Sequence, residues 1–331
     1  MKAFVHEGKQ GIAGTYLRNH EEVEPKENEV SVRMKFAGVN HRDLFVLHRH
    51  AVTGPPLVIG SDGAGVIDRV GTTVTEFKVG DEVIINPSLG WLQKSDAPPD
   101  DFEILGLPDD GTFAEKVIVS SNNIERKPEY LSWEEAGVLP LAALTAYRAL
   151  FTQAELKPTD TVLLPGIGGG AVTFLLLFAK AIGARVIVTS RSQYKCQKAL
   201  ELGADRAIDT NSDWNVHLKE EKIDLVIETV GAVTFNKSLR QLRKGGKIVT
   251  FGASAGDEVQ MNLRDFFYGQ YKMFGTTMGS REEFRQMLQF IQLHQIKPVI
   301  DRVFLLSETK EALNRLMEAE QFGKIAIKIE K

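Results

Sequence analysis

Near the middle of this 331-residue chain, an apolar run ends in a cluster of glycines and then resumes with the character of a helix. The run Val162–Leu164 reads as a strand, and Gly166-x-Gly168-x-x-Ala171 follows it directly. Gly166 permits a tight turn, Gly168 lets another group approach the backbone, and the small Ala171 allows close helix–strand packing. In this context the helix N-terminus offers amide donors to a pyrophosphate, so we predict a dinucleotide site rather than a purely structural turn. Its expected binding residues are Gly166, Gly168, Gly169, Gly170 and Ala171.

Short β-branched or apolar runs alternate with helix-length segments around this turn. The runs are Thr161–Leu164, Arg185–Thr189, Asp224–Glu228 and Lys247–Phe251. The segments between them include Ala171–Ile182 and Lys195–Leu202. Parallel strands need crossover connections, which helices supply, so this third of the chain predicts a doubly wound α/β sheet.

In the first third of the chain, the apolar residues follow the two-residue period of β-strands. Val30–Met34 alternates as a half-buried strand does, and glycines separate the further apolar runs Val66-Ile67 and Val83–Ile85. Ser88–Gly111 is predicted to be a long loop, and loops of that length usually cover a site or are mobile. The remaining predicted elements are helices after the capping boxes Ser132–Glu135 and Ser280–Glu283, a helix near Lys310–Glu320 and a strand at Ile325–Ile329.

Charge and cysteine content exclude several classes of protein. The 40 Lys and Arg residues against 44 Asp and Glu residues argue against a nucleic-acid or anionic-membrane binder. The single cysteine, Cys196, excludes an intrachain disulfide and a site built from several thiolates. The N-terminal residues lack the apolar core of a signal peptide, and the most apolar stretch, 171–181, is shorter than the ~20 residues of a membrane-spanning helix. We therefore expect a cytoplasmic protein with no nucleic-acid or membrane partner.

The end of the second strand of the predicted sheet indicates which dinucleotide binds. An NAD-specific site places Asp or Glu there to hold the ribose hydroxyls. Here the stretch Thr189-Ser190-Arg191-Ser192, followed by Lys195, contains no carboxylate. Ser190 can donate a hydrogen bond, and Arg191 can grip a 2′-phosphate with a forked, charge-assisted contact. We predict NADP(H) bound through Thr189, Ser190, Arg191 and Lys195, the alternative being that Arg191 and Lys195 are solvated charges at a helix start.

Several different short motifs follow one another along the chain. They are Ala37–Asp43, Ile59–Val66, Leu139–Tyr147, Ala184–Ile187, Leu202–Asp205, Met278–Ser280 and Phe322–Lys324. Each is weak alone, but in this order they resemble the medium-chain dehydrogenase/reductase family essentially from end to end. The resemblance implies a GroES-like β-rich catalytic domain plus a doubly wound Rossmann domain. The implied boundaries are 1–142 for the catalytic domain, 143–274 for the cofactor domain and 275–331 for a segment that completes the catalytic domain.

The departures from the family pattern argue against a metal. Zinc-dependent members carry a cysteine, a histidine and a second cysteine at positions that align with Asn40, Ser61 and Leu141. These residues cannot form a thiolate and imidazole site, so we expect no zinc. The four-cysteine lobe that holds structural zinc in such members is replaced by the loop 88–111.

Polar residues close in sequence to the ligand-aligned positions have other expected roles. His41, His48 and His50 lack further partners with metal-ligand spacing and are expected to line or rim a cleft. Asp43 resembles a residue that supports a zinc ligand in metal-dependent relatives, and here we expect it to anchor Ser61 or a loop.

Without zinc, hydrogen bonds alone must stabilise the charge that develops on a substrate oxygen during hydride transfer. The catalytic candidates are Asn40 as an amide donor, His41 as a proton donor and Thr145, which the resemblance places near the nicotinamide. A packing role is the alternative for each. Further expected cofactor-binding residues are Phe251, Gly252, Gly279, Ser280 and Lys324.

A quinone or other conjugated carbonyl compound accepts hydride conjugately and needs a Lewis acid less than a simple alcohol does. We therefore predict a zinc-independent, NADPH-dependent oxidoreductase that acts on a small carbonyl, enone or quinone substrate. The alternatives are an alcohol/aldehyde oxidoreductase of the same family and a catalytically idle NADPH-binding protein. A homodimer is expected through an edge strand of the cofactor domain, with the aromatic-rich segment Val259–Thr277 at the contact. The alternative is that these aromatic residues fill an interdomain core.

Overall fold

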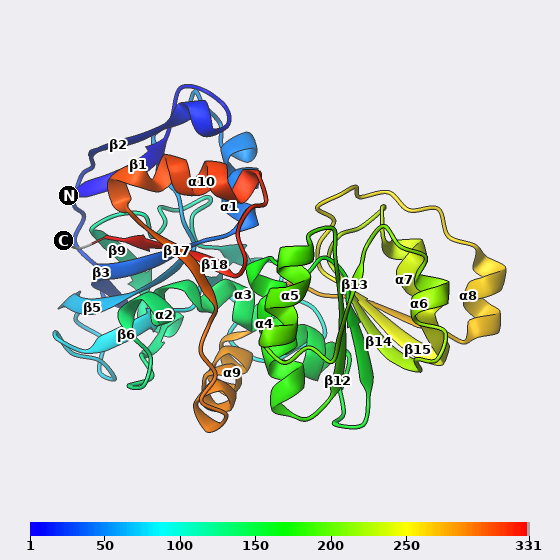
Figure 1. The fold of residues 1–331 in the computed structure, drawn as a ribbon. Coiled ribbons are helices and arrows are strands. Elements are labelled where there is room, and N and C mark those ends of the chain that lie inside the picture. The colour runs from blue at the N-terminus through cyan, green and yellow to red at the C-terminus, as the bar shows by residue number, and fades with distance from the viewer. Residues whose placement is uncertain (330–331) are drawn as a thin grey trace. The chain divides into compact units, whose positions relative to one another are not determined.

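In a computed structural model that describes residues 1–329, the chain forms two units, each with its own sheet and core (Figure 1). One unit contains Met1–Leu144 and the chain from Gly279 onward, and the other contains Thr145–Met278. The chain leaves the first unit two residues after the expected boundary at 142 and returns four residues after the one expected at 274. No helix in residues 1–329 has the length and apolar character needed to cross a membrane.

The unit Thr145–Met278 is built on a six-stranded sheet whose neighbouring strands are all parallel. Its strands are β11 (Thr161–Leu164), β12 (Arg185–Ser190), β13 (Arg206–Asp209), β14 (Ile223–Glu228), β15 (Leu242–Thr250) and β16 (Lys272–Gly275). The spatial order is β13-β12-β11-β14-β15-β16, so the order reverses beside β11. This order confirms the predicted doubly wound sheet, and ligands of such sheets bind at the carboxyl ends of the strands near the reversal.

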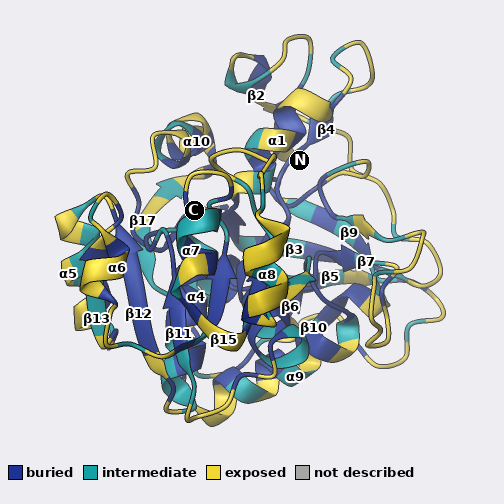
Figure 2. Cartoon of the chain, turned by 90° about the vertical axis from the view of Figure 1, so that its right-hand side faces the viewer, coloured by how far each residue is buried: buried dark blue, intermediate teal, exposed yellow. Residues whose placement is uncertain are grey.

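Helices connect these strands and cover the sheet. They are α4 (Gly170–Ala181), α5 (Gln193–Glu201), α6 (Trp214–His217), α7 (Phe235–Gln241) and α8 (Leu263–Gly269), preceded by the π-helical turn η3 (Arg148–Gln153). Apolar side chains from successive strands, among them Leu163, Ile187 and Ile248, make up the core. Figure 2 shows β11 and β12 largely buried and α8 largely exposed.

The other unit is mainly antiparallel β-structure. Its largest sheet has the order β10-β6-β5-β3-β18-β17, with β9 also paired to β3, and smaller sheets form from β2-β1-β4 and β7-β8. The strands are β1 (Lys2–His6), β2 (Thr15–Asn19), β3 (Glu29–Val39), β4 (Leu57–Val58), β5 (Asp62–Val70), β6 (Glu82–Ile85), β7 (Ser88–Leu89), β8 (Glu103–Ile104), β9 (Lys116–Ser120), β10 (Ile124–Arg126), β17 (Ile300–Leu305) and β18 (Lys324–Lys328). Because β18 pairs with β3, the end of the chain lies beside its first third.

Five α-helices and three 3₁₀ turns within residues 1–329 belong to this unit or to its boundary. They are α1 (His41–Arg49), α2 (Trp133–Val138), α3 (Pro140–Tyr147), α9 (Arg281–Leu293) and α10 (Thr309–Met317), with the 3₁₀ turns η1 (Ile12–Gly14), η2 (Ser121–Asn123) and η4 (Leu306–Glu308). The two predicted capping boxes are confirmed, because Ser132 and Ser280 each accept from and donate to the residue three positions later. α10 packs on β17, β18 and α1.

The segment Ser88–Gly111, predicted as a loop, contains the short paired strands β7 and β8. Trp91 within it is buried, donates its ring N–H to Ser95 and packs edge-on against Phe102. The segment is therefore packed into its unit and presents backbone carbonyls to the neighbouring residues.

Candidate functional site

The glycine turn leaves the start of α4 without a side-chain cap. Gly166 and Gly168 have φ angles of +75° and +138°, which favour glycine, and Gly169 occupies the N-cap position. A Cβ on Gly168 would lie 2.7 Å from Cδ of Lys195, whereas a Cβ on Gly169 would meet no atom within 4 Å. Uncapped amides beside open space fit the pyrophosphate of a dinucleotide.

The end of β12 carries the residues expected to select the dinucleotide. Thr189 is buried, and its hydroxyl lies 2.9 Å from that of Thr210, so it packs beneath the surface at the end of β12. Ser190 accepts from the Ser192 amide. Arg191 is exposed, and its guanidinium forms no hydrogen bond or ion pair with any residue in the described range 1–329. The Arg191 guanidinium and the ammonium of Lys195, whose side chain lies against Gly168, are cations suited to a 2′-phosphate.

Sequence reasoning missed a carboxylate near this position. Asp209 at the end of β13 lies in register beside Ser190, and its Oδ1 accepts from the Asn211 amide at 2.8 Å. The carboxylate therefore caps its own turn. Only the pairing of β12 with β13 brings it close, and no local sequence pattern signals that pairing.

The other expected residues of this unit lie at element ends. Thr145 is buried, and its hydroxyl lies 3.9 Å from Sδ of Met278. Phe251 and Gly252 follow β15 directly. A Cβ on Gly252 would lie 3.0 Å from the carbonyl oxygen of Thr229, so the glycine lets the chain after β14 approach closely.

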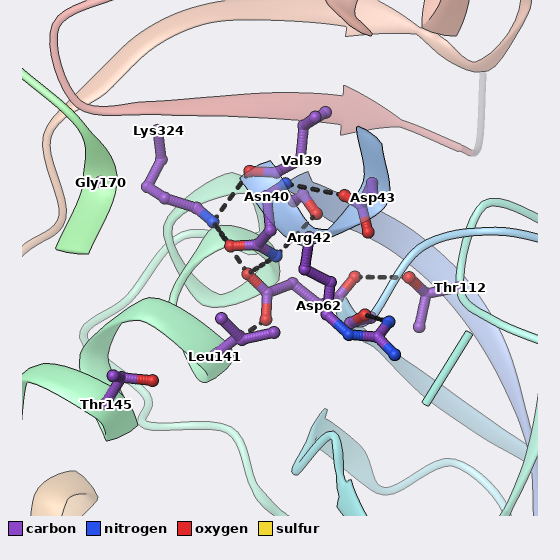
Figure 3. A network of polar contacts seen from close by, with 12 residues as sticks. Val39, Asn40, Arg42, Asp43, Asp62, Thr112, Leu141, Thr145, Gly170 and Lys324 are labelled. Carbon is purple, nitrogen blue, oxygen red and sulfur yellow. Dashed lines mark hydrogen bonds and ion pairs between the residues drawn. The ribbon is translucent and has the colours of Figure 1, made fainter. Parts of the chain in front are cut away.

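In the other unit, a buried polar network surrounds the ammonium of Lys324. Its Nζ donates to Val39 O at 3.0 Å, to Asn40 Oδ1 at 2.5 Å and to Asp62 Oδ2 at 3.0 Å. Asp62 also accepts from the Leu141 amide at 2.7 Å. Figure 3 shows the side chains of Lys324, Asn40 and Asp62 pointing toward one another. Lys324 begins β18, Asp62 begins β5 and Asn40 lies between β3 and α1. All three ammonium protons have acceptors, so the network is a closed, charge-balanced unit.

The network engages the amide of Asn40 on both sides. Its Nδ2 donates to Asp62 Oδ2 at 2.9 Å, while its Oδ1 accepts from Lys324. Asp43, expected to anchor Ser61 or a loop, instead accepts from the Asn40 backbone amide at 2.7 Å at the start of α1. Its second oxygen has no hydrogen-bond partner among residues 1–329, and burial raises the pKa of Asp43 to about 7.

Ser61 is held by a residue that the sequence analysis did not single out. Arg42 Nη1 donates to Ser61 Oγ at 2.8 Å and to Leu105 O at 3.0 Å, and Nη2 donates to Ile104 O at 3.1 Å. Ser61 Oγ in turn donates to Leu105 O at 2.7 Å. Arg42 lies inside the motif Ala37–Asp43, and membership of that motif is its local signal in the sequence.

The three ligand-like positions do not fit a zinc ion. Asn40 and Ser61 are engaged in hydrogen bonds, and Leu141 contributes only a backbone amide. Over residues 1–329, His, Cys, Asp and Glu side chains form no group of three or more suited to a metal. The cations at these positions are the side chains of Lys324 and Arg42.

The histidines do not share one environment. His41 is exposed at the start of α1, yet surrounding protein and the Lys324 charge lower its pKa. His48 is exposed, whereas His50, expected to line or rim a cleft, is nearly buried. Its Nδ1 lies 2.9 Å from Nδ1 of the buried His6, and its Nε2 faces Pro55 O. The His6–His50 pair is therefore a packed core contact.

Two further expected cofactor residues lie at the start of α9. Ser280 is buried, donates to Glu283 Oε2 at 2.9 Å and accepts from the Glu283 amide. A Cβ on Gly279 would lie 2.7 Å from Cδ1 of Leu144, so glycine permits close packing. Asn40, His41, Gly279, Ser280 and Lys324 thus belong to one unit, whereas the glycine turn and Thr189–Lys195 belong to the other.

Comparisons with known proteins identify relatives along nearly the whole chain. Residues 26–129 match the family model of the alcohol dehydrogenase GroES-like domain, and residues 166–292 match that of the zinc-binding dehydrogenases. A zinc-type alcohol dehydrogenase-like protein of Leptosphaeria maculans is 34% identical over 92% of each chain. A crotonyl-CoA reductase of Streptomyces avermitilis is 30% identical over 82% of this chain and 68% of that protein. The crystal structure of an NAD-dependent alcohol dehydrogenase superposes with a TM-score of 0.92, at 33% identity and 100% coverage of both chains.

Proposed function

Because the chain belongs to the medium-chain, zinc-type alcohol dehydrogenase-like family of oxidoreductases, we propose that it is a zinc-independent enzyme that uses NADPH to reduce a quinone or other conjugated carbonyl compound. The observation that carries this proposal is the hydrogen-bonded network at Asn40, Asp62 and Lys324. Zn²⁺ requires sulfur, imidazole or carboxylate ligands in a tetrahedral arrangement, and the positions aligned with its ligands, Asn40, Ser61 and Leu141, instead hold an amide, a hydroxyl and an apolar side chain. The chemistry then has to proceed without a Lewis acid.

The cofactor half of the proposal rests on the unit Thr145–Met278. NADP(H), when bound, supplies the hydride from its nicotinamide ring. The amides at the start of α4 hold the pyrophosphate, while Arg191 and Lys195 attract the 2′-phosphate and Ser190 donates to it. Thr189, whose hydroxyl is paired with Thr210, supports this surface. In this proposal Thr145, Phe251, Gly252, Gly279 and Ser280 contact the cofactor or the reacting groups. Lys324, expected from the sequence to bind the cofactor, instead holds Asn40 and Asp62 in place with its ammonium.

The substrate half rests on reactivity. Hydride addition to a conjugated acceptor spreads the negative charge over an enolate or hydroquinone, so hydrogen-bond donors suffice to stabilise it. A simple ketone or aldehyde places the full charge on one alkoxide oxygen. The similarity to a crotonyl-CoA reductase, whose name denotes a conjugated thioester, supports the conjugated class.

An alcohol or aldehyde oxidoreductase is the second candidate. It is favoured by the names of the Leptosphaeria relative and of the superposed crystal structure. The two candidates differ in the acceptor they require, because only the first depends on conjugation.

An acceptor screen separates the candidates. Purified protein is mixed with NADPH or NADH and with crotonaldehyde, butanal or a benzoquinone, and cofactor oxidation is followed by absorbance. Ethanol with NADP⁺ is tested in the reverse direction. The proposal expects turnover of crotonaldehyde or the quinone, with butanal and ethanol far slower. Equal rates with butanal would favour the second candidate, and cofactor binding without any oxidation would indicate a catalytically idle NADPH-binding protein.

A further inference from the structure

Arg42 is a partly buried cation held only by neutral acceptors. It is the second residue of α1, and its guanidinium donates to Ser61 Oγ, Leu105 O and Ile104 O. Within residues 1–329 it forms no ion pair, because Asp62 is bonded to Lys324 and Asp43 to the Asn40 amide. Burial lowers the pKa of Arg42, while the nearby charges of Asp43 and Asp62 act in the opposite direction without contacting the guanidinium. Such a group is stabilised by an anion that binds to it.

The guanidinium retains donors for that anion. Three of its five N–H groups are used, which leaves Nε–H and one Nη2–H without an acceptor among the described residues. The Nε atom is not among the fully enclosed polar atoms of residues 1–329 that lack a partner, so part of its surface is exposed to solvent. Nε–H and Nη2–H point in one direction as a fork that suits a single oxygen or a carboxylate.

The neighbours of Arg42 fix the direction of this fork. Ser61 Oγ donates its hydrogen bond to Leu105 O at 2.7 Å. Its lone pairs therefore accept from Arg42 Nη1 at 2.8 Å. Leu105 O and Ile104 O come from the packed segment that begins at Ser88. The guanidinium is therefore oriented before any ligand binds, which is the condition for strong electrostatic stabilisation.

We propose that Arg42 is a catalytic residue that binds the carbonyl oxygen of the conjugated substrate and stabilises the enolate charge. The proposal rests on the reductase function above and identifies the cationic group that stabilises the substrate oxygen. Hydride from the dihydronicotinamide forms a C–H bond at the β-carbon, the alkene pair moves to form the enolate, and the carbonyl pair moves to the oxygen held by Arg42. A proton from water then adds to the α-carbon, so one NADPH and one proton reduce one alkene. The same site takes conjugated carboxylates as inhibitors.

The test compares Arg42→Gln and Arg42→Lys with wild type, and uses Arg49→Gln as the matched control. Arg49 is exposed on the same helix, so its substitution removes the same charge without touching Ser61 or the Leu105 carbonyl. With crotonaldehyde, we expect Arg42→Gln to lower kcat/KM about 100-fold. Arg42→Lys keeps the charge and recovers part of the loss, whereas Arg49→Gln stays within about twofold of wild type. NADPH affinity, measured by cofactor fluorescence, should be the same in all four proteins and reports that each is folded.

Two further measurements test the role of the guanidinium group directly. Guanidinium chloride at non-denaturing concentration should restore turnover to Arg42→Ala, whereas equal sodium chloride should not. Calorimetry with cinnamate in the presence of NADP⁺ should show binding to wild type and Arg49→Gln that is lost in Arg42→Gln.

The arms separate the two proposals. If wild type reduces crotonaldehyde and Arg42→Gln does so equally well, the role of Arg42 is refuted and the reductase function stands. If wild type reduces no acceptor, the function fails, and the cinnamate arm alone decides whether Arg42 forms an anion site. Equal cinnamate binding by Arg42→Gln and wild type, or none by either, would overturn it.

Discussion

Nζ of Lys324 lies 3.0 Å from Oδ2 of Asp62, and the two side chains are only 3% and 0% exposed. This ion pair joins β18, near the end of the chain, to β5 in its first third. Asn40 bridges the same two groups. A buried charge that loses its partner is left uncompensated in a medium of low dielectric, so each of these residues depends on the other.

Removing the ammonium should destabilise the fold strongly. Lys324→Met leaves Asp62 buried with only the amide donors of Asn40 and Leu141, and we expect a loss of about 3–5 kcal/mol in the free energy of unfolding. Lys328→Met on the same strand is the control, because Lys328 is exposed, and it should change stability by less than about 0.5 kcal/mol. Denaturant unfolding measures both. Equal stability of Lys324→Met and wild type would show that the pair contributes nothing.

Asp43 gives the protein a pH dependence of a defined sign. Burial raises its pKa to about 7 from an ordinary value of 3.8, so between those pH values the folded chain holds a proton that the unfolded chain has released. This contribution to stability therefore falls as pH rises through that window and levels off above pH 7. Asp43→Asn removes the dependence and keeps an acceptor for the Asn40 amide.

Thermal unfolding across this window tests the sign. The stability of Asp43→Asn relative to wild type should increase as pH rises from about 4 to about 7. Asp109→Asn, at an exposed position, should show no such trend. A difference between Asp43→Asn and wild type that stays constant with pH would contradict the raised pKa.

Local signals account for what the sequence predicted well. β11 spans Thr161–Leu164 as expected, and both capping boxes form, because strand alternation and a Ser/Glu pair act over a few residues. The contacts around Lys324 escaped prediction because they join residues that are 262 and more positions apart. The pairing of His50 with His6 depends in the same way on how β1 meets the end of α1. β15 starts at Leu242 rather than Lys247, because Leu242 pairs with Ile223 before the register shifts to Leu225 and Lys247.

Cofactor preference tests Arg191. One hydrogen bond to a charged group contributes about 1.5–3 kcal/mol, so NADPH should exceed NADH by at least about tenfold in kcat/KM. Arg191→Ala should remove much of that preference by weakening NADPH use and leaving NADH use nearly unchanged. Ser190→Asp should go further, because its carboxylate repels the 2′-phosphate and accepts from ribose hydroxyls. Lys198→Ala is the control, since Lys198 lies on α5, the helix that follows Arg191, and is paired with Glu201. Equal use of both cofactors by wild type would refute this role.

Metal content tests the zinc-independent mechanism. The donors at Asn40, Ser61 and Leu141 predict well under one zinc per chain in purified protein and turnover that a chelator leaves unchanged. Elemental analysis before and after dialysis against chelator measures the first, and the crotonaldehyde assay the second. Stoichiometric zinc that leaves together with activity would be decisive against it.

Assembly is the remaining prediction, and it concerns α8 and β16. β16 is an end strand of the parallel sheet, so one row of its backbone groups has no neighbouring strand among the residues that the structure describes. Phe266 and Tyr271 pack against the core of their own unit, whereas other apolar residues of this segment are 47–68% exposed. These exposed residues are Leu263, Phe267, Tyr268 and Met273. We propose that two copies pair through this surface, since a two-fold axis at an end strand extends the sheet and covers the apolar side chains.

Sedimentation at micromolar concentration should show a dimer for wild type. Tyr268→Glu should shift it to a monomer, because a carboxylate buried at a two-fold contact has no counter-ion. Val216→Glu on α6 is the matched control, since Val216 is equally exposed in the same unit, and it should remain dimeric. Unfolding temperature reports whether either substitution disturbs the fold itself. A wild-type monomer would reject the dimer, and a dimer that persists in Tyr268→Glu would place its contact on another surface.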